Sequence, residues 1–399
     1  IYVRGNEGYC MTNSTATKVG LGAAFSVASV WFTTHAGAGF ATGNQGWQYF
    51  ASYGVPGMVL PLVSMGLLAW ILYEAMLMSQ LIGARSYGDV MKHLFHPYDK
   101  LYLIFEVFYY CIVLAAVGGV ISAATDMVMD VVPISLAPAT IIIGIILVLL
   151  IIFGADLVRK VATVLGILII FCGFSIWILG IAAHTQQLGE AISTGFAPNG
   201  WAYPLWRSII YCGFQCVALP ALVGCCDTLT TKKSLKQSAV LGFLLNGFGV
   251  AVSAWMLVAW HSDITAAGEI ALPNLYVCGQ LGIPVLFYFY QICLFCCLIS
   301  TGVGCIFGIV VRLENSIFTK ASGIMSNLTA KRLLITVVAI LVCMGISTFG
   351  LSNIVSTGYQ FCGYLGLIGC AVPFLVVGIR KNRKMIAEGK TGLLTDLKK

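Results

Sequence analysis

Charged residues are scarce in this chain of 399 residues: they make up 9% of it, while hydrophobic residues make up 59%. An ordinary soluble domain carries about 25% charged residues, so the composition excludes a soluble globular protein. The 22 Lys and Arg and the 15 Asp and Glu cluster between long stretches that carry none, as expected if these stretches lie in hydrocarbon and the clusters in water. The sequence therefore predicts an all-α polytopic membrane protein.

Signatures of several other functional classes are also missing. Basic residues lie at the ends of apolar runs and form no basic arm, so no nucleic-acid partner is expected. The segment 389–391 resembles a nucleotide-binding loop, but Lys384 occupies the position of its required first glycine. His93 and His96 lack Cys or carboxylate partners at ligand spacing. We expect no enzyme, no cofactor and no metal other than sodium, and most of the 15 cysteines to be buried apolar residues.

Ten apolar runs are long enough to cross about 30 Å of hydrocarbon, which takes roughly 20 residues. They cover approximately 22–50, 55–82, 101–128, 137–155, 160–183, 204–226, 235–260, 284–311, 332–349 and 354–379. Short cytoplasmic loops collect Lys and Arg, which tests this count. With the N-terminus inside, only Arg207 of the 22 basic residues falls on the outer side. The charges therefore predict ten spans with both termini in the cytoplasm.

The first and sixth runs contain residues that interrupt a membrane helix. Three glycines and a polar tail lie between His35 and Gln45, and the sixth run contains Gly213, Gln215 and Pro220, of which proline removes a backbone donor and clashes with the preceding turn. Breaks in helices one and six match a five-plus-five repeat with halves of opposite orientation. This arrangement is typical of secondary transporters, whose unwound segments hold the solute near the membrane middle.

Two further points follow from the position of the breaks. The glycines of the first run have an alternative interpretation, in which Gly39 and Gly43 only allow close helix packing. The repeat interpretation predicts the following division of the chain: a cytoplasmic tail 1–19, a five-helix repeat 20–183, an extracellular connection 184–203, an inverted five-helix repeat 204–380 and a basic cytoplasmic tail 381–399.

The first break resembles a known signature. Residues 37–50, GAGFATGNQGWQYF, resemble the GAGFASG-x-E-x-x-x-FF signature of the bacterial YkvI-type membrane proteins. Their Gly-x-Gly core resembles the first helix of the amino acid–polyamine–organocation superfamily. The resemblance implies the LeuT fold over essentially all of residues 20–380 and a bacterial cytoplasmic membrane. Asn44 and Gln45 stand where an acidic residue is usual, and His35 precedes the motif, so these departures leave the coupling open.

The resemblance also implies a solute site. In the superfamily the Gly-x-Gly amides, here of Gly37, Ala38 and Gly39, receive an amino acid carboxylate, and exposed N–H groups at a half-helix N-terminus are an anion site on physical grounds. Free carbonyls of the sixth helix, from Cys212 through Gly213 to Phe214, could receive the ammonium. The expected side-chain pocket, which favours a neutral amino acid or an aromatic solute, consists of Phe40, Tyr109, Tyr110, Phe214, Gln215 and Phe295.

A cation site is expected on the eighth run. Ser300 and Thr301 follow Cys297 by three and four residues, so two hydroxyls and a carbonyl can meet on one helical face. This pattern resembles the sodium site of sodium-coupled LeuT-fold transporters, where carbonyls of the broken first helix, here Ala36 and Gly39, complete the ligands. In the alternative interpretation each hydroxyl only bonds the carbonyl four residues back.

Four ionisable side chains within the runs are candidates for coupling or gating. His35 could carry a proton near neutral pH or serve as a hydrogen-bonded structural residue. Glu74 and Glu106 lie near the cytoplasmic ends of helices two and three, which suits snorkelling or an inner gate. Arg207 lies about two turns outside the second break, which suits an interfacial anchor, an outer gate or contact with a substrate carboxylate.

The expected function is secondary active transport. The chain would import a small amino acid-like solute with a cation, sodium being favoured over a proton, by alternating access. A non-transporting sensor on the same fold, as in spore germination receptors, is the alternative. A channel would need a continuous polar stripe, whereas the polar residues here are isolated. Membrane lipid is the other expected partner, and the oligomeric state is left open.

Overall fold

The computed structural model describes residues 21–35, 38–84, 86–153, 155–316 and 328–397, and within these ranges the regular structure is helical. Uninterrupted long helices follow seven of the predicted spans. They are α4 (Val55–Ile82), α6 (Tyr102–Val131), α7 (Leu136–Phe153), α8 (Ala155–Ala183), α12 (Lys232–Ala259), α15 (Pro284–Ser316) and α16 (Leu328–Ser347). A helix satisfies its own backbone polar groups, so apolar runs of this length form helices in a membrane.

The remaining three predicted positions in the bundle hold segmented helices. The first contains α1 (Leu21–His35), α2 (Ala38–Ala41) and α3 (Asn44–Tyr49), and the sixth contains α10 (Ala202–Gln215) and α11 (Leu219–Cys225). The tenth contains α17 (Leu351–Asn353), α18 (Tyr359–Gly366) and α19 (Ile379–Ala387). The connecting helices are α5 (Tyr87–Phe95), α9 (Thr185–Thr194), α13 (His261–Ala267) and α14 (Pro273–Gln280).

Length and apolarity alone identify eight possible spans among the described residues, or nine if 168–183 and 185–194, which meet at 74°, are taken as one bent span. The first helix is not among them because its longest piece, α1, has only 15 residues. The fifth helix, α8, is 29 residues long but enters this count only through 168–183, so the difference from the predicted ten lies in these two helices.

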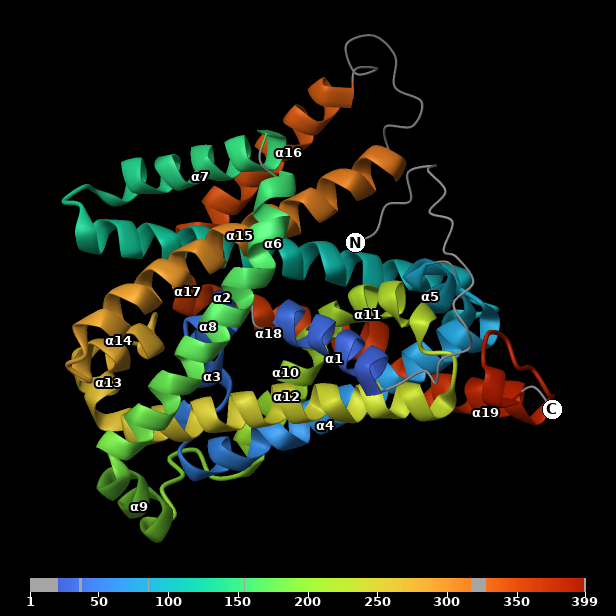
Figure 1. Ribbon diagram of the computed structural model, residues 1–399, viewed down its shortest axis with the longest axis horizontal. Coiled ribbons are helices and arrows are strands. Elements are labelled where there is room, and N and C mark those ends of the chain that lie inside the picture. The colour runs from blue at the N-terminus through green and yellow to red at the C-terminus, as the bar shows by residue number, and fades with distance from the viewer. Residues whose placement is uncertain (1–20, 36–37, 85, 154, 317–327, 398–399) are drawn as a thin grey trace.

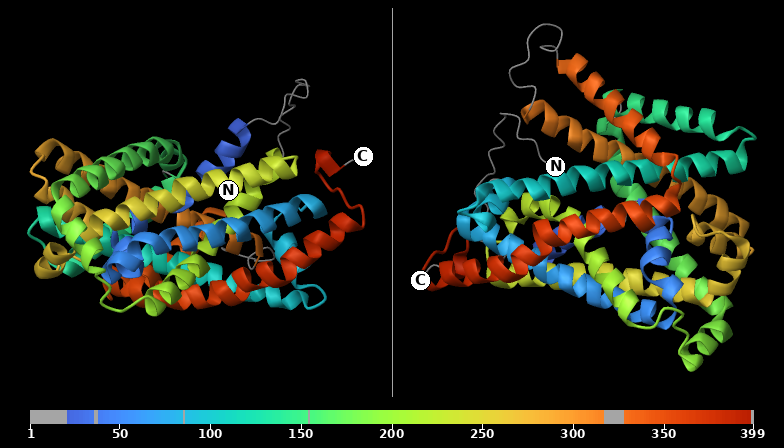
Figure 2. Two further views of the ribbon diagram at one scale, coloured as in Figure 1. Left: turned by 90° about the horizontal axis from the view of Figure 1, so that it is seen from below. Right: turned by 180° about the vertical axis from the view of Figure 1, so that it is seen from behind.

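The helices form two packed groups with two flanking helices. In the first group α12 packs along α4 and α1, and α10 packs on α4; in the second α6, α7, α15 and α16 pack on one another. Of the flanking helices, α8 packs on α15 and α12, and the tenth helix packs on α10 and α4. Figures 1 and 2 show α4 and α12 running side by side on the opposite side of the molecule from α7 and α16.

The long helices run between two faces of the protein. The helices α5 and α19 lie at one end, near the C-terminus, and α9, α13 and α14 lie at the other (Figure 1). We call these ends the α5 face and the α9 face. The connection between helices two and three is thus at the α5 face, and that between helices seven and eight is at the α9 face, as an inverted repeat requires.

Residues near the end of the chain join several helices at the α5 face. Asn382 donates to the Glu74 carboxylate at 2.7 Å, and the Leu393 and Thr395 amides donate to the carbonyls of Gln80 and Thr230 at 2.9 and 2.8 Å. The predicted gate candidate Glu74 therefore links the second helix to the tenth. The tenth helix itself contains three π-helical stretches, Ile354–Gly358, Leu367–Ala371 and Phe374–Gly378, a geometry frequent at functional sites.

Candidate functional site

The first helix is broken where its glycines predict. α1 ends at His35, α2 is four residues long, and Gly43 joins α2 to α3 with a φ of 83°. That left-handed conformation strongly favours glycine. Ala36 and Gly37 lie outside the described residues, and of Ala38 only the backbone is described.

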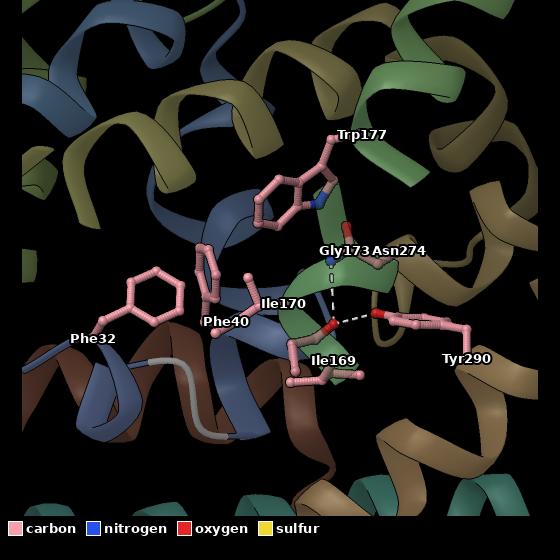
Figure 3. A pocket seen from close by; sticks show the side chains of 9 residues that line it. Phe32, Phe40, Ile169, Ile170, Gly173, Trp177, Asn274 and Tyr290 are labelled. Carbon is pink, nitrogen blue, oxygen red and sulfur yellow. Dashed lines mark hydrogen bonds between the residues drawn. The ribbon is translucent and has the colours of Figure 1, made fainter. Parts of the chain in front are cut away.

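Residues from the other half of the chain bridge the carbonyl groups of this break. The carbonyl oxygen of Ala41 accepts hydrogen bonds from the Tyr290 hydroxyl of α15 and from the Asn274 side chain of α14, the latter at 3.2 Å (Figure 3). The Asn274 amide also donates to the Thr42 carbonyl at 3.2 Å. Carbonyls that a regular helix would pair internally are thus held by α14 and α15.

A small aromatic cavity lies against the break. Its volume, measured as the space open to the centre of a water molecule, is about 10 Å³, roughly room for one water. The rings of Phe40 and Trp177 meet edge to face with centroids 5.4 Å apart. The lining side chains come from the first, fifth and eighth helices and α14, and those labelled in Figure 3 are Phe32, Phe40, Ile169, Ile170, Gly173, Trp177, Asn274 and Tyr290.

Two polar atoms of this lining lack hydrogen-bond partners in the described part of the chain. They are the Nε1 donor of Trp177 and the Oδ1 acceptor of Asn274, and both are buried. A buried polar group without a partner costs about 1–3 kcal/mol. Two of the residues that line the cavity therefore each carry a buried polar atom without a partner, and that of Asn274 lies next to Gly43.

Sequence reasoning found Phe40 but missed the other side chains of the cavity. Trp177 lies inside an apolar run and Tyr290 inside another, so nothing in the sequence separates them from core residues. Asn274 lies in a connection that the hydropathy pattern assigns to no span.

His35 lies in a buried hydrogen-bonded network beside the break. Its Nδ1 is 2.7 Å from Asn246 Oδ1, and its Nε2 is 2.6 Å from the Tyr211 hydroxyl. The Asn246 amide nitrogen donates to the Gly242 carbonyl at 2.8 Å, so its oxygen faces His35 and Nδ1 carries the hydrogen. Tyr211 also reaches Gln45 Oε1 at 3.3 Å. These contacts place His35 in a hydrogen-bonded network with the sixth and seventh helices, and a polar Asn246 within a span was the signal that could have revealed the network.

The sixth helix is interrupted less than its sequence predicts. α10 continues through Gln215, and one 3₁₀ turn, Cys216–Ala218, separates it from α11. The carbonyls of Gly213 and Phe214 both accept from the Cys216 amide, and the Cys212 carbonyl accepts from the Cys216 thiol at 3.5 Å. The expectation of free carbonyls at these three residues is therefore wrong, because the 3₁₀ turn that follows them pairs each one.

Gly213 and Phe214 are occupied by packing against the tenth helix. A Cβ on Gly213 would meet the Gly363 carbonyl, so the glycine allows the two backbones to cross closely. The Phe214 ring is buried and lies edge to face on Tyr359, with centroids 5.2 Å apart. Gln215 reaches toward the break and donates to Gln45 Oε1 at 3.3 Å.

Tyr109 and Tyr110, two residues of the predicted pocket, are not among the residues that line this cavity. The Tyr109 ring stacks on the Arg312 guanidinium, whose carbon lies 3.8 Å from the ring centre. Arg312 Nη1 lies 3.6 Å from Glu106 Oε2, and the Tyr87 hydroxyl donates to Glu106 Oε1 at 2.6 Å. We call Tyr87, Glu106, Tyr109 and Arg312 the Arg312 cluster. Sequence could not show which way Tyr109 faces, because α6 is apolar all round.

Among the predicted cation ligands of the eighth helix, Ser300 already forms a hydrogen bond within its own helix. The Ser300 hydroxyl donates to the Cys297 carbonyl at 3.3 Å, three residues back rather than the four of the alternative interpretation. Thr301 is partly buried. α15 packs against α2, which carries Gly39, so the two helices named for the site are neighbours. A hydroxyl that donates a hydrogen bond keeps its lone pairs, and the sodium site stays a prediction.

Arg207 lies buried on the α9 side of the break, with 3% of its surface exposed. Its Nη1 donates to Gln360 Oε1 at 2.5 Å and its Nη2 to the Gln48 carbonyl at 3.3 Å. The guanidinium carbon lies 4.3 Å from the centre of the Tyr49 ring. These contacts join the sixth helix to the first and tenth, and we call Arg207, Gln48, Tyr49 and Gln360 the Arg207 cluster.

Solved transporter structures share this architecture. A Na⁺-coupled sialic acid symporter in a substrate-bound outward-open state is similar with a TM-score of 0.60 and 10% identity, over 90% of each chain. A point mutant of the Eremococcus coleocola manganese transporter is similar with a TM-score of 0.56 and 16% identity, over 94% of this chain and 85% of that one. Mhp1, a nucleobase-cation-symport-1 family transporter, closed with bromovinylhydantoin bound, gives 0.50 and 13%, over 84% and 75%.

These similarities confirm the predicted fold class, an all-α polytopic membrane protein with the LeuT-type inverted repeat. No protein-family model and no curated protein sequence matches the chain. The fold is therefore shared with transporters whose sequences are at most distantly similar to this one.

Proposed function

We propose that this protein is a secondary active transporter that imports a small amino acid-like solute together with a cation by alternating access. The observation that carries the proposal is the cavity at the broken first helix. Two residues that line it, Trp177 and Asn274, carry buried polar atoms without a partner in the described ranges, and transporters of this architecture bind their solutes at such a break.

The proposed solute is small and neutral overall. In this conformation the cavity has room for roughly one water, so we expect it to widen when the solute binds. Its polar lining suits one acceptor and one donor of the solute, and Phe40 and Trp177 suit an apolar side chain. The amides of Gly37, Ala38 and Gly39 complete the proposal by receiving the carboxylate. Manganese is not proposed as the solute, since no group of three or more His, Cys, Asp or Glu within the described ranges could hold a metal ion.

The proposed coupling ion is sodium, held by the hydroxyls of Ser300 and Thr301 and by carbonyls of Cys297, Ala36 and Gly39. Support comes from the packing of α15 against α2 and from the oxygen chemistry of this set, since small hard cations prefer oxygen ligands. A proton carried by His35 is the second candidate, supported by its hydrogen bonds to Asn246 and Tyr211.

The proposed location is the bacterial cytoplasmic membrane, with the α5 face in the cytoplasm. The support is the charge distribution, in which Arg207 alone of the 22 Lys and Arg residues falls on the other side. Membership of the YkvI-type group is proposed on the signature of residues 37–50.

Uptake by the purified protein in proteoliposomes tests the proposal. We expect at least one of the roughly 20 common amino acids to accumulate when a sodium gradient is imposed, since binding at such a site drives alternating access. Gly39→Leu should abolish this uptake, because a Cβ on Gly39 would already meet the Gln45 side chain. Gly345→Leu is the matched control, since nothing lies within 4 Å of a Cβ at that position. Normal uptake by Gly39→Leu would contradict a site at the break.

Removal of two hydroxyls tests the ion. The double variant Ser300→Ala, Thr301→Ala should require at least about tenfold more sodium for half-maximal uptake, because each lost ligand costs about 1–3 kcal/mol. Uptake that is indifferent to sodium and driven fully by a pH gradient would exclude the sodium site and favour His35. Binding without any accumulation would favour the alternative function, a solute sensor.

A further inference from the structure

Arg207 carries a buried positive charge that the described protein does not neutralise. Only 3% of its surface is exposed, and no Asp or Glu of the described ranges forms an ion pair with it. Isolating a charge from water costs several kcal/mol unless a partner of opposite charge is present. Such a charge persists in a membrane protein where it has a function.

The hydrogen bonds of this guanidinium are unevenly distributed. Nη1 donates to Gln360 Oε1 at 2.5 Å and to the Ser356 carbonyl at 3.5 Å. Nη2 donates to the Gln48 carbonyl at 3.3 Å, the Tyr53 hydroxyl also contacts the Arg207 side chain, and Nε has no partner among the described residues. Nε and Nη2 form one edge of the guanidinium, and this edge matches the two oxygens of a carboxylate.

The surroundings of Arg207 provide a way to open this edge. Ser356 lies within the first π-helical stretch of the tenth helix, Ile354–Gly358, and Gln360 lies one turn beyond. The contacts from Nη1 therefore all go to the tenth helix, whereas Nη2 and the Tyr49 ring connect Arg207 to the first helix. If the tenth helix moves, the first and sixth helices keep Arg207 in place beside the break.

We propose that the Nε and Nη2 edge of Arg207 receives the carboxylate of the solute on the α9 side of the break, before the solute enters the aromatic cavity. This inference rests on the proposed function, of which it specifies the solute class: a compound with a free carboxylate. The ligand's charge neutralises the guanidinium, and Nε gains its missing acceptor. The contact to Gln360 holds the arginine in the closed state, when no carboxylate is bound.

Amino acids and their primary amides test this proposal, because the amide lacks the negative charge. Each common amino acid that raises the melting temperature of the wild-type protein in sodium buffer is titrated beside its amide. We expect the acid to bind about tenfold or more tightly than the amide, given a charge-assisted pair of hydrogen bonds. In Arg207→Met the two affinities should become equal. Arg207→Lys keeps the positive charge but lacks the two parallel N–H donors of the guanidinium, so it should retain only part of the preference for the acid over the amide.

Arg312→Met is the matched control, because that arginine is already paired with Glu106, and it should leave the preference of the acid over the amide unchanged. An Arg207→Met protein that folds and keeps the wild-type preference would overturn the proposal and leave carboxylate recognition to the glycine amides. If Arg207→Met fails to fold, an Arg207→Lys protein that keeps the full preference for the acid over the amide would also overturn the proposal.

A third arm separates this proposal from the proposed function. If no amino acid binds or accumulates, the transport proposal fails, and acetate, propionate and benzoate are titrated beside their amides instead. Stabilisation by the carboxylates alone, lost in Arg207→Met, would support the anion site without amino acid transport. No stabilisation, or an equal stabilisation by chloride, would overturn the carboxylate site.

Discussion

Two arginines lie on opposite sides of the broken helix, and their surroundings differ in one respect. Both guanidinium groups stack on a tyrosine, Arg207 on Tyr49 and Arg312 on Tyr109. Arg312 faces the Glu106 carboxylate at 3.6 Å, while the side chain that Arg207 contacts most closely is the neutral amide of Gln360.

This difference is what we expect between an arginine that holds two helices together and one that binds a ligand. The pair of Arg312 and Glu106 is neutral within the protein, so it can hold α6 and α15 together without any ligand. The contacts of Arg207 go to neutral acceptors, which we expect a carboxylate to outcompete. Gln360 binds Arg207 through a neutral amide, which holds it less tightly than a carboxylate would. We therefore expect the α9 side of the break to open more easily than it would with a glutamate at this position.

The largest effect in this comparison is expected when the Arg312 cluster is made to resemble the Arg207 cluster. Glu106→Gln should lower the free energy of unfolding by about 2 kcal/mol, because it removes the carboxylate that faces a partly buried arginine. Chemical unfolding in mixed micelles measures the change. The double variant Glu106→Gln, Arg312→Met removes both charges and should recover most of the loss. An unchanged stability of Glu106→Gln would show that Arg312 does not depend on this carboxylate.

The converse substitution should have the next largest effect. Gln360→Glu gives Arg207 a carboxylate from the protein itself, so the closed state should gain about 1.4 kcal/mol and transport should fall about tenfold. Uptake at limiting solute concentration measures it. Gln360→Met is the control, because it removes the contact to Arg207 without adding charge and should not slow opening. Faster uptake by Gln360→Glu would contradict the proposal that the contact between residue 360 and Arg207 holds the closed state.

The smallest expected effect concerns the histidines of the two faces. Burial, and next to it the charges of Lys381 and Lys390, lower the pKa of His93 in α5 from 6.5. Burial lowers the pKa of His261 in α13 at the other face. The unfolded chain therefore binds protons at higher pH than the folded protein, and stability should fall as the pH drops below about 6.5.

Salt should distinguish these two histidines. Salt of about 1 M reduces the Debye length to about 3 Å, which weakens the lysine contribution at His93 but not the burial of His261. The melting temperature of His93→Gln, compared between about pH 5 and about pH 7, should thus show a pH dependence that no longer changes with salt, while His261→Gln keeps the salt effect. Each contribution should be under about 1 kcal/mol. An equal salt response of both variants would contradict the assignment.

The sequence predicted most of the spans because hydrophobic length is a local property. The predicted run 55–82 coincides with α4, and the glycines of the first run correctly located its break, since Gly43 adopts a conformation that few other residues tolerate. The extent of the break in the sixth helix was harder to predict, because a glycine can allow either an unwound turn or close helix packing. Gly213 allows contact with Gly363, and no local pattern distinguishes that contact from an unwound turn.

The candidate site was predicted less completely because its residues meet through tertiary packing. Phe40 lies in the cavity as expected, but its partners Trp177 and Tyr290 come from helices that are apolar on all sides. Periodicity cannot orient such helices, and for the same reason Tyr109 was expected in the cavity although it stacks on Arg312. Arg207 was identified from its charge alone, because a basic residue in that position is rare.

The π-helical stretch Ile354–Gly358 also fixes the register of everything that follows it in the tenth helix. A π turn contains one residue more than an α turn, and one residue rotates an α-helix by about 100°. If the same residues wound as a regular α-helix, with none removed, Gln360 would turn by about 100° away from Arg207. The direction of Gln360 thus depends on the π winding of the residues before it.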